Sequence, residues 1–79
     1  MYYVYIIQST IAPQKYIGFS ENLKQRIKDH NAGACQHTAK FKPWKLKFYA
    51  AFETKQRAMD FERYLKSGSG HSFSSRHLL

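Results

Sequence analysis

The sequence predicts an α+β fold in which a three-stranded, mainly antiparallel sheet is flanked by helices, in the order ββαβα. Two runs rich in β-branched and aromatic residues, 2–9 and 15–19, lie close together near the N-terminus. A third run, 46–53, alternates in the way a half-buried strand does. Residues 21–32 and 55–66 carry apolar side chains at helical spacing.

The first two strands are expected to form a hairpin. Apolar residues occupy both alternating sets of positions in residues 2–9, which is typical of a central strand covered on each face. Residues 10–14, which include Pro13, break this strand and return the chain. In the second strand, 15–19, Gly18 allows backbone or ligand to come close.

The first helix, 21–32, is expected to begin after Ser20 as its N-cap and to end near Gly33. The polar and basic segment 34–45 contains Pro43, so it predicts a long loop with room for one helical turn.

The third strand and the last helix follow this loop. Residues 46–53 place four apolar side chains on one face, and Thr54 can cap the helix at 55–66. Two glycines then suit a left-handed C-cap, and a phosphate-binding loop is disfavoured because such loops join a strand to a helix. The apolar residues are Leu46, Phe48, Ala50 and Phe52, and the glycines are Gly68 and Gly70.

Size and charge narrow the classes of function. A chain of 79 residues predicts one small domain over residues 1–79. It has 13 Lys and Arg against 5 Asp and Glu, a formal net charge of +8, which should attract nucleic acid. Because Cys35 is the single cysteine, an internal disulfide is excluded and a reduced, cytoplasmic setting fits. The apolar run 2–7 is too short to span a membrane.

One acid lies where a helix should be apolar. At about 100° per residue, Glu62 falls within the arc formed by Ala58, Phe61 and Leu65. An unpaired buried carboxylate is costly, so Glu62 is a candidate functional residue. The alternative is that Glu62 pairs with a nearby cation or lies just outside the arc.

The first helix has ionisable residues on its apolar face as well. Arg26 and His30 lie one turn apart, on the side that also carries Leu23 and Ile27. Taken singly, each has an ordinary explanation, as a long side chain passing the edge of the core or as a hydrogen-bonded buried histidine. Together with Glu62, they indicate one shared site.

These residues and the order of elements resemble the GIY-YIG endonuclease family. The family includes homing endonucleases, restriction enzymes, a DNA-repair incision domain and small stand-alone bacterial proteins, which this chain resembles most. The resemblance extends from Tyr3 to about Gly70. It rests on Tyr3-Val4-Tyr5, Tyr16-Ile17-Gly18, Arg26, His30 and Glu62.

The resemblance implies a metal-dependent endonuclease that cleaves nucleic-acid phosphodiesters. Glu62 would hold one divalent cation, Mg²⁺ or Mn²⁺, because hard cations prefer oxygen ligands. Arg26 would clamp the non-bridging phosphate oxygens. Tyr5 or Tyr16 would accept a proton from the attacking water or orient it, and His30 would hydrogen-bond a tyrosine or the phosphate.

Three positions depart from the family pattern. Tyr3 replaces the first Gly, and Phe19 stands where several members carry Lys. The asparagine that many members have beyond the metal-binding glutamate has no obvious counterpart, and residues 72–75 contain serines instead.

The loop predicts a surface that tracks a nucleic-acid strand. Lysines would contact phosphates, while Phe41 and Trp44 would contact bases. The alternative is that Trp44 caps the small core and the lysines are merely solvated. A zinc site is disfavoured, because the spacing of Cys35, His37, His71 and His77 matches no closed zinc site. The lysines are Lys40, Lys42, Lys45 and, beside them, Lys47.

The predicted function is therefore cleavage of DNA, single-stranded or branched forms included, with RNA left open as a substrate. The alternative is a nucleic-acid-binding module with little or no hydrolytic activity. A third class is a protein-interaction domain that uses its basic face on an acidic partner.

Overall fold

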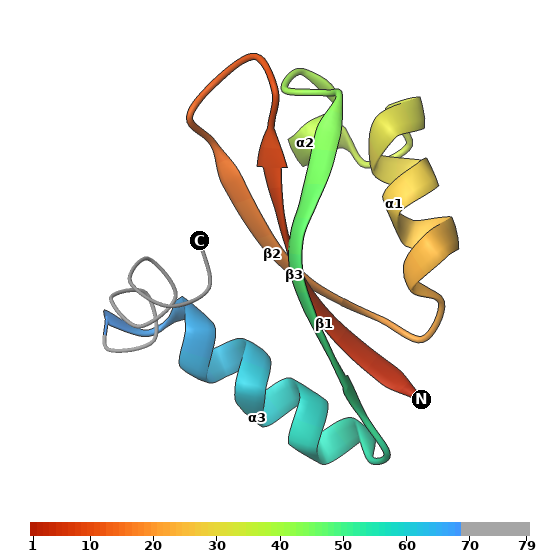
Figure 1. Ribbon diagram of the computed structural model, residues 1–79, viewed down its shortest axis with the longest axis vertical. Helices are drawn as coiled ribbons and strands as arrows, with labels where there is room; N and C mark the ends of the chain where they lie inside the picture. Colours follow the sequence, from red (N-terminus) through yellow and green to blue (C-terminus); the bar gives the residue numbers. More distant parts are fainter. Residues whose placement is uncertain (69–79) are drawn as a thin grey trace.

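The computed structural model, which describes residues 1–68, is a three-stranded sheet between two layers of helix (Figure 1). The central strand β1 pairs antiparallel with β2 and β3, giving the order β2-β1-β3. Helices α1 and α2 lie on one side of the sheet and α3 on the other. The elements are β1 Tyr2–Ser9, β2 Lys15–Ser20, α1 Leu23–Ala32, α2 Gln36–Ala39, β3 Trp44–Phe52 and α3 Lys55–Lys66.

This arrangement confirms the predicted α+β class and its antiparallel sheet. The observed order is ββααβα, because the one helical turn allowed for in the predicted loop is present as α2. None of the helices within residues 1–68 is long and apolar enough to cross a membrane.

Strand β1 divides the core into two layers. Val4 and Ile6 face α3 and pack with its Ala58 and Leu65. Tyr5 and Ile7 face the opposite way, and Leu23 and Ile27 of α1 pack against them. These four strand residues are at most 1% exposed, so β1 is covered on both faces, as its sequence predicts.

A bulge in β3 changes which face one of its residues occupies. Ile6 pairs with Phe48, but the next residue, Ile7, pairs with Leu46, which leaves Lys47 unmatched. Phe48 and Phe52 therefore face α3, whereas Leu46 lies on the α1 side. The expectation that Leu46 shares their face is wrong, because one extra residue reverses the alternation.

Helix α1 begins at Leu23, two residues after the predicted start. Its N-cap is Asn22, whose side-chain oxygen accepts a hydrogen bond from the Gln25 backbone N–H at 3.2 Å. Ser20 instead accepts a hydrogen bond from the Asn22 N–H at 3.0 Å, so it stabilises the turn before the helix. The helix ends at Gly33, which has the left-handed φ of 79° that favours glycine there.

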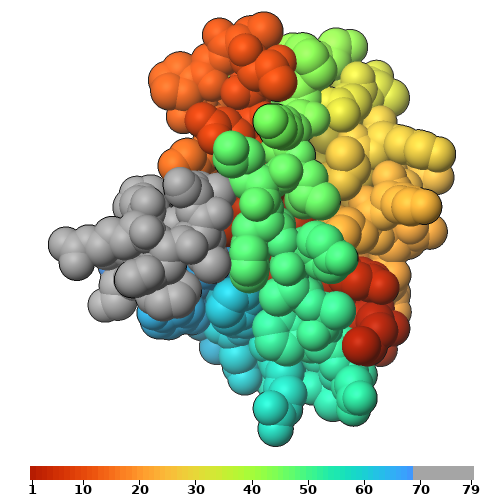
Figure 2. All heavy atoms as spheres, in the orientation of Figure 1, coloured from red at the N-terminus to blue at the C-terminus, as the bar shows by residue number. Residues whose placement is uncertain are grey.

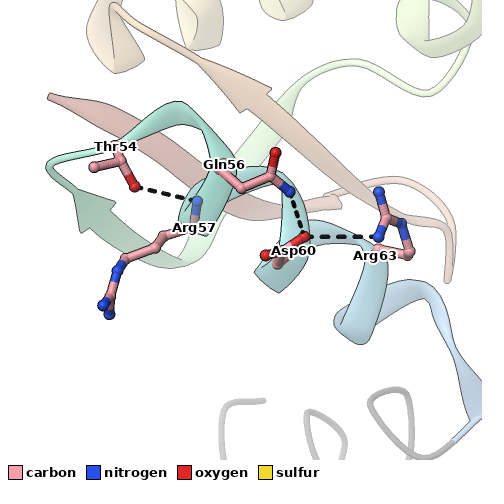
Figure 3. Close-up of polar contacts among 5 residues, drawn as sticks. All are labelled: Thr54, Gln56, Arg57, Asp60 and Arg63. Carbon is pink, nitrogen blue, oxygen red and sulfur yellow. Dashed lines mark hydrogen bonds and ion pairs between the residues drawn. The ribbon is translucent and has the colours of Figure 1, made fainter.

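The bounds of α3 agree with the prediction, and Thr54 caps it by accepting a hydrogen bond from the Arg57 N–H at 3.3 Å. Figure 3 shows this cap beside the outer face of the helix, where Gln56 and Arg63 both contact Asp60. That face is polar because the other one covers the sheet.

The C-terminus of α3 differs from the prediction. Its C-cap is Ser67, with a φ of −76° and a hydroxyl that donates to the Tyr64 carbonyl at 2.6 Å. Gly68 does not have the positive φ expected of it, and Gly70 lies outside the described residues.

One side chain connects the end of α1 to the start of β3. The Asn31 amide donates to the Trp44 carbonyl at 3.3 Å and accepts from the Trp44 N–H. Both backbone groups at this end of the strand are thus satisfied by one residue.

We expect Asn31→Ala to lower the free energy of unfolding by about 1–2 kcal/mol, because two backbone groups lose their partner. Urea denaturation measures the change. Gln25→Ala is the control: its side chain donates to Asp29 on the same exposed helix face, so its effect should stay within about 0.5 kcal/mol. Equal effects of the two substitutions would contradict the role given to Asn31.

Candidate active site

Four of the five predicted catalytic residues come together on the α1 side of the sheet. Tyr5 lies on β1, Tyr16 on β2, and Arg26 and His30 on α1. The His30 ring is 5.8 Å from the Tyr5 ring and 5.1 Å from the Tyr16 ring, measured between centroids. Arg26 forms a hydrogen bond with Tyr5, which raises the pKa of the guanidinium.

Gly18 provides the space for this cluster. It lies directly opposite Tyr5 in the sheet, and a Cβ at that position would be 2.4 Å from the Tyr5 hydroxyl oxygen. Any larger residue would displace the phenol. The sequence predicts that Gly18 lets backbone or ligand come close, and in the structure the group that comes close to it is the Tyr5 phenol.

A chain of hydrogen bonds runs inward from the Tyr5 hydroxyl. It contacts His30 Nε2 at 2.8 Å, and His30 Nδ1 contacts the Thr38 hydroxyl at 2.8 Å. The Thr38 hydroxyl donates to the Cys35 carbonyl at 3.3 Å.

One arrangement of protons satisfies all three of these bonds. A carbonyl oxygen only accepts, so the single Thr38 proton goes to Cys35. Thr38 must then accept from Nδ1–H of His30, which leaves Nε2 without a proton. The Tyr5 hydroxyl therefore donates to Nε2.

Burial keeps both Tyr5 and His30 neutral. It raises the pKa of Tyr5 to about 12, and the hydrogen bond from Arg26 opposes this rise only in part. Burial, followed by the positive charge of Arg26, lowers the pKa of His30. Near neutral pH the cluster therefore contains a phenol and an unprotonated imidazole beside one cation.

That cation has no acidic partner among residues 1–68. The ion pairs in this part of the chain both lie on α3, and neither involves Arg26. Its Nε is buried without a hydrogen-bond partner. A partly buried guanidinium that no carboxylate neutralises suits an anion supplied from outside, such as a phosphate.

Glu62 lies on the helix that covers the opposite side of the sheet. Its side chain is 20% exposed and forms an ion pair with Lys66, one turn on, at 3.2 Å. Pairing with a nearby cation is the alternative predicted for Glu62 from the sequence. Phe61, about 100° away around the helix, packs on Phe48 and Phe52 of β3. Ala58 and Leu65, which lie between Phe61 and Glu62 around the helix, pack on β1. Glu62 therefore lies on the side of α3 nearer β2, the edge strand that carries Tyr16.

The side chains that could bind a metal ion suit a hard cation that keeps most of its water ligands better than a cation bound by protein groups alone. Residues 1–68 contain no group of three or more His, Cys, Asp or Glu side chains that could hold a metal ion. A single, partly exposed carboxylate such as Glu62 suits Mg²⁺, which keeps several waters. Four residues of the sequence are candidate zinc ligands, although their spacing disfavours such a site. Cys35 and His37 belong to no group of three or more metal-binding side chains within residues 1–68, and His71 and His77 lie outside the described residues.

The loop residues divide into surface and core. Lys40, Lys42 and Lys45 are exposed, as strand-contacting lysines must be. Trp44 is only 5% exposed, and its indole N–H donates to the Thr38 carbonyl at 2.9 Å. The expectation that Trp44 stacks on bases is therefore corrected: it caps the small core, because a buried indole needs an internal acceptor.

Sequence reasoning missed Thr38, which is 2% exposed and supports both His30 and Trp44. It lies in α2, the one turn within the predicted loop. A threonine in a polar loop carries no periodic signal, so only the hydrogen bonds identify it.

The family model for the GIY-YIG catalytic domain matches residues 1–74 of this chain. The chain belongs to the GIY-YIG family. This confirms the resemblance inferred from the two tyrosine strands and the helical Arg, His and Glu.

The chain is similar to several UPF0213 proteins. A UPF0213 protein of Clostridium perfringens is 39% identical over 67 residues, covering 84% of this chain and 71% of that protein. The solution structure of a UPF0213 protein from Bacillus halodurans is 29% identical, with a TM-score of 0.58, and covers 99% of this chain and 87% of that one.

A longer relative carries a functional name. The structure-specific endonuclease subunit SLX1 homolog of Giardia intestinalis is 37% identical over 65 residues. The match covers 76% of this chain but only 18% of the Giardia protein. This GIY-YIG chain thus corresponds to a small part of that relative.

The buried phenol gives a spectroscopic prediction. On alkaline titration followed by phenolate absorbance, one of the six tyrosines should ionise only near pH 12, because Tyr5 is removed from water. Tyr5→Phe should abolish that late step. Between about pH 10 and 12 the folded state holds this proton more tightly than the unfolded chain, so stability should fall as the pH rises. A late step that persists in Tyr5→Phe would contradict the assignment.

Proposed function

We propose that this protein is a divalent-metal-dependent endonuclease that hydrolyses phosphodiester bonds in DNA. One observation carries the proposal: a partly buried guanidinium, which has no carboxylate partner within residues 1–68, lies against a phenol that is hydrogen-bonded to a neutral imidazole. Membership in the GIY-YIG family supports a nuclease, since the matching model is that of a catalytic domain.

Arg26 would bind the scissile phosphate. Its guanidinium can donate to two non-bridging oxygens at once, and it would stabilise the negative charge that builds up during attack. The phosphate would in turn neutralise the positive charge of Arg26, which lies beside Tyr5, Tyr16 and His30.

Tyr5 and His30 would move the proton of the attacking water. Tyr5 is fully buried in the free protein, so the attacking water would reach its hydroxyl once a bound phosphate draws Arg26 away from it. The hydroxyl would then pass its proton to the unprotonated Nε2 of His30 while it takes one from the water. The hydroxide would form a bond to phosphorus as the bond to the leaving 3′ oxygen breaks. Tyr5 begins and ends this step as a neutral phenol, which suits a hydroxyl whose pKa is about 12.

Tyr16 would orient the water from the edge strand, and Glu62 would hold one Mg²⁺ or Mn²⁺ from the other side of that edge. Such an ion, when bound, polarises a phosphoryl oxygen and stabilises the leaving oxygen. Lys40, Lys42 and Lys45 would contact phosphates of the DNA backbone further along the strand.

The experiment that tests the function is a cleavage assay with Mg²⁺ or Mn²⁺, and without either, on plasmid, single-stranded, branched and RNA substrates. Arg26→Ala and Glu62→Gln should each lower the rate about 100-fold or more while the fold remains. Asp60→Asn, an exposed acid on the same helix, should leave the rate unchanged. Robust metal-dependent cleavage by either site variant would refute the assignment. Binding without cleavage of any substrate would instead favour a binding module.

Thr38 should act as a positioning residue through His30. Thr38→Val removes the acceptor for Nδ1–H, so His30 can carry its proton on Nε2 instead, where it blocks transfer from Tyr5. We expect the rate to fall about tenfold or more, as for other residues that orient a functional histidine. Thr38→Ser, which keeps the hydroxyl, should retain the rate. NMR of the imidazole nitrogens should show the changed tautomer in the valine variant only; an unchanged tautomer there would disprove the role.

A further inference from the structure

A groove of about 810 Å³ lies beside the candidate active site, on the same side of the sheet. Its walls are the first turns of α1 and the exposed part of β3. Figure 2 shows the start of β1, in red, between β3 and α1 on this face. The volume is in the range of sites that hold small organic ligands, a nucleoside or two included.

Aromatic and aliphatic side chains line the groove and remain accessible. Tyr49 is 53% exposed, and its ring lies 6.2 Å from that of Tyr3. Leu46 is 36% exposed and faces the groove because of the bulge in β3. An exposed ring, a partly buried ring and an exposed leucine gathered in one hollow form an apolar patch of the kind that marks a ligand-binding groove.

The charges at the rim favour an anionic occupant. Lys24 and Lys28 lie one helical turn apart on α1 and both line the groove. Within residues 1–68, neither forms an ion pair with an acid. Glu21 is the single acid among the lining residues, at the N-terminal end of the groove.

The groove adjoins the candidate active site. Tyr49 lies directly opposite Tyr5 in the sheet. Ile27 packs against the cluster of Tyr5 and also lines the groove, and Arg26 is its neighbour in sequence. A strand with a phosphate at Arg26 would therefore bring its next nucleotides to Tyr49 and Leu46.

We propose that this groove binds unpaired bases of the DNA strand that is cut, with their faces on Tyr49 and Tyr3 and their phosphates at Lys24 and Lys28. The inference rests on the proposed function and adds a substrate feature to it. Unpaired bases offer flat faces for stacking on aromatic rings, whereas a duplex hides those faces inside its own stack.

Binding measured without divalent cations tests the groove separately from hydrolysis. Fluorescence anisotropy would compare a single strand, a duplex of the same sequence and a single strand of RNA. Tyr49→Ala should weaken single-strand binding roughly 5- to 100-fold, the effect of losing one stacked base, and change duplex binding little. Tyr49→Phe should bind as the unchanged protein does.

Two further variants make the test specific. Tyr64→Ala removes an exposed tyrosine of α3, on the other side of the sheet, and should leave binding unchanged. Lys24→Gln with Lys28→Gln, both exposed, should reduce the slope of log affinity against log salt by about two.

Equal affinity for single strand and duplex, or no effect of Tyr49→Ala, would overturn the proposal that the groove binds unpaired bases. Either result would leave the proposed nuclease function intact. A marked preference for RNA would overturn its assignment to DNA. If Tyr49→Ala weakens single-strand binding but no substrate is cleaved with Mg²⁺ or Mn²⁺, the groove stands and the nuclease function fails.

Discussion

The hydrogen bond between Tyr5 and His30 is the constraint on which the rest of this structure depends. Tyr5 is fully buried on the central strand, so its hydroxyl needs an internal partner. His30 meets that need and in turn needs Thr38, which fixes α2 and Trp44 in place. One buried phenol thus determines how α1, α2 and the start of β3 are positioned relative to the sheet.

The same constraint explains the unusual charge distribution. Packing His30 against Tyr5 places Arg26, one turn earlier, at the edge of a region of phenols and imidazole, where no acid of residues 1–68 forms an ion pair with it. The described ion pairs lie instead on α3, across the sheet. The helix that could neutralise the guanidinium is therefore separated from it by the sheet, and the positive charge remains available to a ligand.

Much of this arrangement can be predicted from the sequence. Composition locates the first two strands, apolar periodicity locates the third strand and both long helices, and the helical period places Arg26 and His30 on the inner side of α1. Features that depend on tertiary contacts cannot be predicted in this way. The β3 bulge moves Leu46 to the other face, Asn22 replaces Ser20 as N-cap, and the burial of Trp44 depends on a carbonyl that only folding brings near. Thr38 becomes recognisable only through its bonds.

The bulge at Lys47 has a consequence for solubility. Strand β3 is an outer strand, so one row of its backbone amides and carbonyls faces away from the sheet. A flat outer strand is a template on which another molecule can add its own strand and begin to aggregate. An irregularity combined with exposed Lys45 and Lys47 interrupts that template and repels a similarly charged copy.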